Sequence, residues 1–291
     1  MTHAPQVAVV VPTYKRPQAL GRCVRALMDQ RVDWNYEVIV VNDGDPGEIA
    51  RDDLPPGARL IDVGGNNASQ ARNVGARAAE ASVLVFLDDD CKPLPGFLAE
   101  LVTALESADA VGARTINAAP GSPPGQASQV IEDELARRWN PDQGDARFLS
   151  GRALAFRREA FLSAPFDERF ASTGGEDRAL SATWRALGRR LRYEPRARVL
   201  HYGPRSLKEF VAQHRRYGRG AWVLRRNGDL RGNVTGPSVR SPAFYAGLVR
   251  AALASPQRPR SVAALVLLTQ VVMVVSYLAT ALEEGLKRRL T

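Results

Sequence analysis

The chain has 291 residues, and 45% of them are hydrophobic, which is enough to build the core of an α/β domain with a C-terminal appendage. Its two cysteines, Cys23 and Cys91, lie far apart and form no CxxC pair, so neither a disulfide framework nor a zinc site is expected. The N-terminus lacks a basic flank, and its apolar run is too short for a signal peptide. We therefore expect a catalytic part that stays in the cytoplasm.

Charge is distributed unevenly along the chain. Residues 1–177 contain 18 Lys+Arg and 26 Asp+Glu, whereas residues 178–226 contain 14 Lys+Arg and 2 Asp+Glu. The acidic part suits a bound cation, and the basic part suits an anion or an anionic membrane. The arginines lie among strand and helix patterns without a nucleic-acid-binding motif, so we expect no nucleic-acid partner.

Short apolar runs alternate with helical patterns through the first 117 residues. The patterns predict strands at 7–11, 37–41, 59–63, 83–87 and 110–116, and helices at 17–30, 67–79 and 95–105. This alternation predicts an α/β fold with a doubly wound, mostly parallel sheet. Residues 118–125 are rich in Pro, Gly and Ser, and we expect a surface loop between a first half, 1–117, and a second half, 126–226.

Three carboxylates, Asp88, Asp89 and Asp90, follow the apolar strand at 83–87. Side chains alternate along an extended chain, so Asp88 and Asp90 are expected on one side and Asp89 on the other. Two converging carboxylates repel each other unless a cation lies between them, and hard oxygen ligands suit Mg²⁺ or Mn²⁺. The sequence therefore predicts a metal site, with a solvated acidic turn before the next helix as the alternative.

Polar residues also follow the other predicted strands. They are Pro12 to Arg16, Asn42 to Asp45, Gly64 to Asn66, and Arg72 with Asn73. The chain has neither GxGxxG after the first strand nor a Walker loop. Because ligands of open α/β sheets bind beyond the carboxyl ends of the strands, we expect a nucleotide site built from carboxylates and a metal.

A second acidic motif, Gly174-Gly175-Glu176-Asp177, precedes a helical pattern at 178–187 with Leu180, Trp184 and Leu187 on one face. A carboxylate near a helix N-terminus is held in its charged form and can serve as a general base. Acids at this position also cap helices, which is the alternative role.

Two further positions are candidates in the second half. The stretch from Ser150 to Phe156 is expected to be a strand edge that lines the ligand pocket, with Gly151 allowing close approach. His201 ends an apolar strand, where it is either a packed core residue or a metal ligand.

Taken together, the ordered motifs resemble family-2 glycosyltransferases. The motifs are Pro-Thr-Tyr-Lys-Arg (12–16), Val-Asn-Asp-Gly (41–44), Ala-Arg-Asn-Val-Gly (71–75), Leu-Asp-Asp-Asp (87–90), Gly-Gly-Glu-Asp (174–177) and Val-Leu-His (199–201). The resemblance implies the GT-A fold and transfer of a sugar from a nucleotide-sugar donor with inversion. It places Thr13, Tyr14 and Asp43 at the nucleobase, Pro12 elsewhere in the donor site, and Arg72 near the base or phosphates. It also places Asp88 on the ribose side and near the metal, Asp90 on the metal, and His201 as a further metal ligand.

Two departures from the family pattern bear on specificity. Many relatives have two acids where this chain has Asn42-Asp43, and the retained Asp43 is the one implied to accept from the base. Gln213 to Tyr217 resembles the Gln-x-x-Arg-Trp signature of processive relatives, with Tyr217 in place of Trp. That substitution argues against processive synthesis.

Residues 227–291 form the expected C-terminal segment. Residues 261–282 are 22 in number and carry no charge, enough for a helix to cross a hydrocarbon core of about 30 Å. Thr269, Ser276 and Thr280 share one helical face, which equally suits a helix laid on a membrane or packed on a partner. Cations flank both ends, so they select no orientation; they are Arg258, Arg260, Lys287, Arg288 and Arg289. We expect association with the inner face of the cell membrane, with a buried or dimer helix as the alternative.

The sequence favours a metal-dependent transferase of the cell-envelope polysaccharide type. Its donor is expected to be a UDP-sugar, its acceptor a glycan or lipid-linked hydroxyl, and its general base Asp177 beside Glu176, with Mn²⁺ or Mg²⁺ neutralising the diphosphate. One alternative is a magnesium-dependent phosphatase or nucleotidyltransferase. Another is a non-catalytic sugar-nucleotide binder, in which Asp177 would be dispensable.

Overall fold

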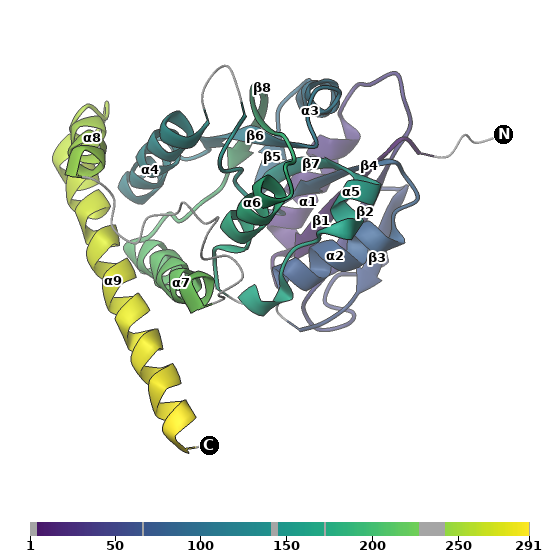
Figure 1. Cartoon of the computed structure of the whole chain (residues 1–291). Helices are drawn as coiled ribbons and strands as arrows, with labels where there is room; N and C mark the ends of the chain where they lie inside the picture. The colour runs from purple at the N-terminus through teal and green to yellow at the C-terminus, as the bar shows by residue number, and fades with distance from the viewer. Residues whose placement is uncertain (1–4, 66, 141–144, 172, 227–241, 291) are drawn as a thin grey trace.

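The computed structural model describes residues 5–65, 67–140, 145–171, 173–226 and 242–290. The expected cluster residue Asn66 and residues 227–241 of the expected C-terminal segment lie outside this part, as do the side chains of Lys287, Arg288 and Arg289. Within the described residues an eight-stranded sheet, in the order β3-β2-β1-β4-β7-β6-β8-β5, has helices on both faces (Figure 1).

The sheet is parallel in its first half and mixed in its second. The strands are β1 (Val7–Thr13), β2 (Tyr36–Asn42), β3 (Ala58–Asp62), β4 (Val83–Leu87), β5 (Cys91–Pro93), β6 (Ala110–Asn117), β7 (Ala153–Arg157) and β8 (Leu191–His201). The parallel pairing of β1 with β2 and β4, and of β2 with β3, confirms the predicted doubly wound arrangement. β7 is antiparallel to both β4 and β6, so the segment expected as a strand edge is an interior strand that begins at Ala153.

The helices alternate with these strands and then continue as a C-terminal group. They are α1 (Pro17–Met28), α2 (Ala68–Ala78), α3 (Phe97–Leu105), α4 (Pro123–Trp139), α5 (Arg158–Ser163), α6 (Glu176–Ala186), α7 (Leu207–Arg226), α8 (Pro242–Leu253) and α9 (Pro259–Leu290). The loop expected at 118–125 is too long by its last three residues. Pro123 starts α4, because the Ser122 hydroxyl caps this end by accepting from the Gly125 N–H and proline suits a first helical position.

Alternate residues of β1 enter two different cores, as expected for a sheet covered on both faces. Val9 packs on the side of α1 and α3, whereas Val10 packs on the side of α2, α5 and α6. Trp184 of α6 is fully buried against Phe156 with a ring-centroid distance of 4.8 Å, and its indole N–H donates to the Ala164 carbonyl at 2.8 Å. The predicted apolar face of α6 is correct for Leu180 and Trp184 but wrong for Leu187, which follows the last turn and is exposed.

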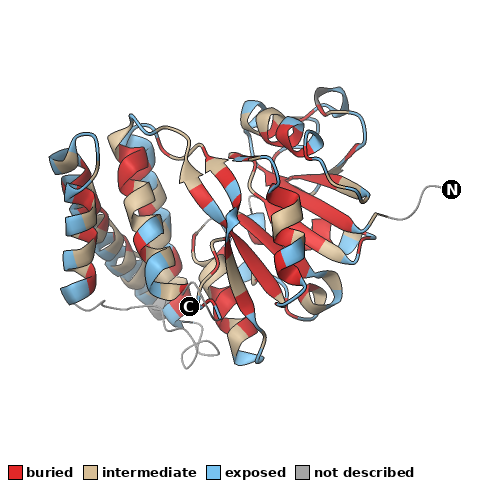
Figure 2. Ribbon diagram, turned by 90° about the horizontal axis from the view of Figure 1, so that it is seen from above, coloured by how far each residue is buried: buried red, intermediate tan, exposed pale blue. Residues whose placement is uncertain are grey.

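A third core joins α4 to the C-terminal helices. Ala127 of α4 and Phe210 of α7 pack with Leu248 of α8 and with Val262 and Val266 of α9. Figure 2 shows this helical group beside the buried sheet. α4, which the sequence pattern did not predict, therefore connects the sheet to α8 and α9.

Candidate active site

A cavity of about 320 Å³ lies at the carboxyl ends of β1, β2 and β4 and is closed on its other side by α4, α6, α7 and α9. All the site residues expected from sequence line it: Pro12, Thr13, Tyr14, Asp43, Arg72, Asp88, Asp90, Gly151, Glu176, Asp177 and His201. Asn42 and Asn73 do not line it. The Asn42 side chain accepts from the Gly44 N–H at 3.0 Å to hold the turn, and the Asn73 amide donates to the Phe166 carbonyl at 2.9 Å.

The three acids after β4 point to two sides, as the alternation of side chains along an extended chain predicts. Asp88 and Asp90 line the cavity, whereas Asp89 is buried and accepts from the Thr13 hydroxyl at 2.7 Å. Burial raises the pKa of Asp89 to about 7, although Arg16 opposes the shift. The Arg16 guanidinium contacts Asp89 Oδ1 and Asp90 Oδ2, each at 2.7 Å. Arg16 therefore fixes the turn that presents Asp90 to the cavity.

Asp90 meets His201 because the short strand β5 pairs antiparallel with the end of β8. This register aligns Cys91 with His201, and the Tyr202 N–H donates to the Asp90 carbonyl at 2.9 Å. Asp90 Oδ1 then lies 3.7 Å from His201 Nε2. A Cβ on Gly203 would approach the imidazole to 2.8 Å, so glycine provides space for this ring.

The electrostatics of this pair fit a metal ion. Burial, followed by nearby Arg152, lowers the pKa of His201, which favours the neutral imidazole that ligates metals. Burial opposes ionisation of Asp90, but His201 and Arg16 outweigh it and lower the pKa of that carboxyl. Among the described residues, no three His, Cys, Asp or Glu side chains are grouped closely enough to hold a metal alone. An ion here would need oxygen ligands from a bound molecule as well.

Arg72 of α2 connects the two sides of the cavity. Its guanidinium is buried and donates to Asp88 Oδ1 at 2.6 Å and to Glu176 Oε1 at 3.5 Å. Burial disfavours its charge, but Asp88 and Glu176 more than compensate and raise the pKa of Arg72. A buried arginine held between two acids provides a fixed positive charge in the crevice.

Glu176 and Asp177 occupy the first turn of α6, which starts two residues earlier than the predicted helix. The chain enters this turn through Gly175 at φ 109°, a conformation that favours glycine. At Gly174, a Cβ would come within 2.6 Å of the Tyr217 ring on α7. The two glycines therefore let the loop turn tightly beneath α7 and direct both acids into the cavity.

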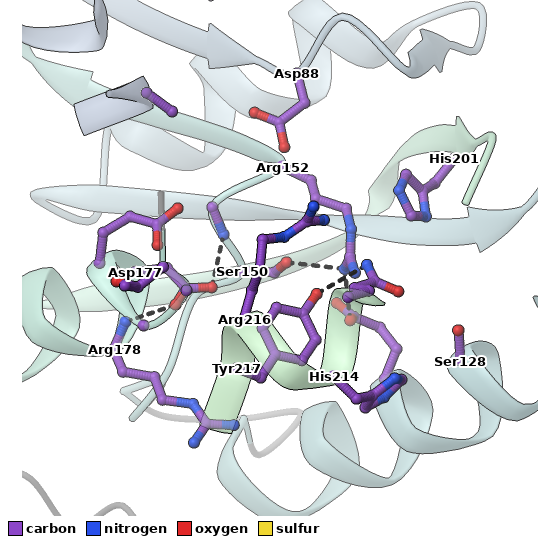
Figure 3. Close-up of a pocket in the computed structure, with 18 of the residues that line it drawn as sticks. Asp88, Ser128, Ser150, Arg152, Asp177, Arg178, His201, His214, Arg216 and Tyr217 are labelled. Atoms are coloured by element: carbon purple, nitrogen blue, oxygen red, sulfur yellow. Dashed lines mark hydrogen bonds and ion pairs between the residues drawn. The ribbon is translucent and has the colours of Figure 1, made fainter. Parts of the chain in front are cut away.

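The two acids are held differently. Asp177 Oδ1 accepts from the Arg178 N–H at 2.8 Å, and Oδ2 accepts from the Gly151 N–H at 3.2 Å, whereas the only ion pair of Glu176 among the described residues is with Arg72. Burial raises the pKa of both carboxyls, and the charge of Asp177 contributes further to the pKa of Glu176, which reaches about 7. In Figure 3, Asp177, Asp88 and His201 point toward the same space from three different elements.

A polar cluster joins α4 to the turn before β7, which lies in a stretch that the sequence predicted to line the pocket; only the member on α4, Glu132, was not predicted. Arg152 Nη1 donates to Glu132 Oε2 at 2.6 Å. It also donates to the Ser150 hydroxyl at 3.2 Å (Figure 3). Burial opposes ionisation of Glu132, but Arg152 outweighs it and lowers the pKa of this carboxyl. Tyr217 lies in the same region and accepts from the Gln213 amide at 3.0 Å.

The remaining wall is mainly helical and combines polar with apolar side chains. Its apolar residues include Ile131 and Leu135 of α4, Ala221 and Leu224 of α7, and Met273 of α9, and its polar residues include Gln213, His214 and Arg216 of α7 and Thr269 and Gln270 of α9. Arg16 and Arg152 lie inside sequence stretches that were already candidates for the site. Those stretches could therefore have identified both arginines as cavity residues. Glu132 and the α9 residues had no such signal, because only the packing of α4 and α9 brings them to the cavity.

The fold and the cavity define an α/β protein whose crevice presents carboxylates, an imidazole and buried arginines. Residues 8–163, more than half of the chain, match glycosyl transferase family 2. The chain belongs to this family and is a glycosyltransferase domain with the GT-A fold.

Individual relatives agree with that assignment. The chain is 29% identical over 231 residues to a pre-mycofactocin glycosyltransferase of Mycobacterium tuberculosis, which covers 75% of this chain and 47% of the relative. It is 26% identical over 212 residues to the chondroitin synthase of Escherichia coli, which covers 59% and 31%. The chain thus spans about half the length, or less, of these curated relatives.

A solved structure supports the same fold. The mannosyltransferase PcManGT from Pyrobaculum calidifontis, in complex with GDP-Man and Mn²⁺, aligns with a TM-score of 0.58 at 19% identity. The alignment covers 100% of this chain and 82% of the mannosyltransferase chain. The C-terminal helices are therefore included in the structural likeness.

Proposed function

We propose that this domain transfers a sugar from a UDP-sugar to a hydroxyl of a glycan or lipid-linked acceptor, with inversion at the anomeric carbon. One observation carries the proposal: Asp90 and His201 approach to 3.7 Å in the same cavity that Asp177 lines from α6. The mannosyltransferase with GDP-Man and Mn²⁺ and the chondroitin synthase support a nucleotide-sugar donor and a glycan product.

The nucleotide would lie along the ends of β1 and β2. Thr13 is fixed by Asp89, and the neighbouring Tyr14 ring is partly exposed, so it can cover a base. Asp43 is buried and lines the cavity, where it can accept from a base N–H. Asp88, held by Arg72, would face the ribose side, and Arg72 would offset phosphate charge.

Asp90 and His201, with Asp88 nearby, would hold Mn²⁺ or Mg²⁺. When bound, such an ion acts as a Lewis acid that neutralises the diphosphate leaving group. The oxygen and imidazole donors, an ionised carboxylate and a neutral ring, are those that these ions accept.

Asp177 would take the proton of the acceptor hydroxyl as the new bond forms. Its two backbone hydrogen bonds fix the carboxylate, and its raised pKa makes it a better base than an exposed aspartate. Glu176 would support this position through Arg72. Inversion needs a single displacement, so one correctly placed base is sufficient.

We place the domain at the inner face of the cell membrane, in cell-envelope polysaccharide synthesis. α9 supports a membrane location by its length and apolar composition alone, since in the described part of the chain Pro259–Leu286 is one helix that meets the length and hydropathy of a membrane span.

Thermal-shift measurements with UDP, GDP and TDP, each with and without Mn²⁺, test the proposal. We expect the largest rise in melting temperature with UDP plus Mn²⁺. Asp90→Ala should abolish the metal-dependent part and lower turnover by about a thousandfold or more, since Lewis-acid stabilisation is worth several kcal/mol. Asp45→Ala removes an exposed acid outside the cavity and should behave as wild type. Mn²⁺-dependent nucleotide binding that persists in a folded Asp90→Ala protein would contradict the metal assignment.

A further inference from the structure

α9 has an inner face that is packed along much of its length. Val262 and Val266 join the core formed with α4, α7 and α8. Further along, the Ser276 hydroxyl donates to the Arg215 carbonyl of α7 at 2.8 Å. A Cβ on Gly218 of α7 would lie 2.6 Å from the Met273 carbonyl, so the two helices approach closely there.

The opposite face of α9 is an exposed apolar stripe. Its residues recur every three or four positions, as one helical face requires, and each is 53–69% exposed. This outer stripe comprises Leu267, Val271, Val274, Val275, Leu278, Leu282 and Leu286. Single exposed leucines are ordinary, but a continuous row along a 32-residue helix marks an interaction surface.

The inner face excludes a helix that crosses a bilayer in this fold. Thr269, Gln270 and Met273 line the cavity, and α7 runs beside α9 with the exposed Arg215 and Arg219 on either side of Gly218. A crossing helix would carry these polar and charged groups to hydrocarbon depth, at high energetic cost. Only the outer stripe can enter lipid, and it can do so only with the helix axis along the membrane plane.

The charges near α9 indicate that the outer stripe binds an anionic lipid surface rather than a second copy of the chain. Exposed Arg258 and Arg260 lie at the start of α9, and the exposed Arg215 and Arg219 belong to α7 where it packs against the middle of α9. No carboxylate of the described residues forms an ion pair with any of these four arginines. Two copies meeting through the outer stripe would bring like charges together, whereas lipid phosphates would neutralise them.

We propose that α9 lies in the plane of an anionic membrane, with the outer stripe in the boundary between headgroups and acyl chains and the neighbouring arginines at lipid phosphates. This surface is distinct from the donor site. Docking through this surface would also determine where the cavity lies relative to the membrane. Because Thr269, Gln270 and Met273 belong to the same helix, docking holds that wall of the cavity at the lipid surface.

Sedimentation of the purified full chain with vesicles tests the proposal. We expect binding to vesicles of equal parts phosphatidylglycerol and phosphatidylcholine, much weaker binding to phosphatidylcholine alone, and release by alkaline carbonate. Leu278→Glu should weaken binding by about tenfold or more, given the cost of removing a buried leucine from an apolar phase. Leu187→Glu, at a similarly exposed leucine far along the chain from α9, is the matched control and should bind as wild type.

Three results would overturn the proposal. They are equal binding by the Leu278→Glu and wild-type proteins, resistance of the bound chain to carbonate, and no binding to anionic vesicles. A dimer in solution that Leu278→Glu dissociates, without a change in vesicle binding, would assign the stripe to a second copy. Nucleotide binding in the thermal-shift assay should remain unchanged in Leu278→Glu, so failure here is distinguishable from failure of the proposed function.

Discussion

The two walls of the cavity are built on different principles. The wall that we propose binds the donor, called the donor wall, consists of Thr13, Asp43, Asp88 and Asp90 and comes from the ends of parallel strands within the first 90 residues. The wall that we propose faces the acceptor, called the acceptor wall, comes from α4, α6, α7 and α9, which are spread over residues 123–290. Asp88 and Asp90 pair with Arg72 and Arg16, whereas Asp177 in the acceptor wall accepts hydrogen bonds from backbone N–H groups.

Because of this difference, we expect donor affinity to depend mainly on one wall and turnover mainly on the other. Arg16 and Arg72 hold Asp90 and Asp88 in place before any ligand arrives, so the donor wall is preorganised for the nucleotide that we propose it binds. The acceptor wall depends on how helices cross, at positions where glycines allow backbones to touch. Changes in the acceptor wall should therefore alter turnover more than donor affinity.

The largest effect expected in the acceptor wall is that of Asp177→Asn. The amide keeps the shape of the side chain but removes its basicity, and positioned base catalysis is worth about 10² to 10⁴ in rate. We expect turnover to fall by that factor while the UDP and Mn²⁺ dissociation constants remain close to wild type. Initial rates at saturating donor, together with calorimetric titration of UDP, measure the two quantities separately.

Glu176→Gln is the control for this substitution, since its carboxylate contacts Arg72 rather than the Gly151 loop. It should reduce turnover less than Asp177→Asn does. If Asp177→Asn transfers at nearly the wild-type rate, the base lies elsewhere or the domain only binds sugar nucleotides. A larger loss in Glu176→Gln than in Asp177→Asn would assign the base to Glu176.

The donor wall could be predicted from sequence because parallel strands end at one edge of a sheet. Knowing only that β1, β2 and β4 are strands brings Thr13, Asp43 and Asp88 together. The contact between Asp90 and His201 needed β5, and a strand of three residues leaves no periodic signal. The sequence pattern suggested His201 only as one of two possibilities.

Residues of the acceptor wall could be predicted from sequence only where they belong to a recognisable local motif. Glu176 and Asp177 follow two glycines and precede a clear helix, so local sequence was sufficient. Glu132 lies on a helix whose start was taken for a loop, and Gln270 lies in an apolar run that suggested only a membrane or partner helix. Which face of such a helix meets a cavity depends on tertiary packing that no local pattern records.

An intermediate effect is expected from Gly220→Ala in α7. A Cβ at this position would overlap the Gly174 carbonyl oxygen, so the loop before α6 must move. Because the same loop positions Glu176 and Asp177, we expect turnover to fall by up to about 10²-fold, the cost of misplacing reacting groups by about 1 Å. Donor affinity, measured by titration of UDP with Mn²⁺, should change much less.

Gly285→Ala provides the matched control, because a Cβ there meets nothing within 4 Å on the exposed side of α9. This substitution should leave turnover unchanged and favour the helix slightly, by up to about 1 kcal/mol. Equal turnover in the two alanine variants would show that the contact between α7 and the Gly174 loop does not position the acids.

The smallest effect concerns the pH dependence of stability at the junction of the two walls. Burial, with the charge of Asp177 adding to it and Arg72 opposing it, raises the pKa of Glu176 to about 7, whereas in the unfolded chain this carboxyl titrates near about 4.3. The folded state therefore binds the proton more tightly. The stability that this proton contributes is fully present below the unfolded pKa and is lost as pH rises through about 7.

Glu176→Gln removes this titration, since an amide is neutral throughout the range. Between pH 5 and pH 8, the free energy of unfolding of the variant should therefore rise relative to wild type by about 1 to 3 kcal/mol, at about 1.4 kcal/mol per pKa unit. Urea unfolding of both proteins at the two pH values measures the change. If the free energy of unfolding changes equally with pH in the two proteins, Glu176 is already ionised near pH 5. The charge of Arg72 would then outweigh the effect of burial on the pKa of Glu176. In that case, the charge of Glu176 is stabilised by Arg72 in the same way as that of Asp88 in the donor wall, and repulsion from Asp177 has little effect on it.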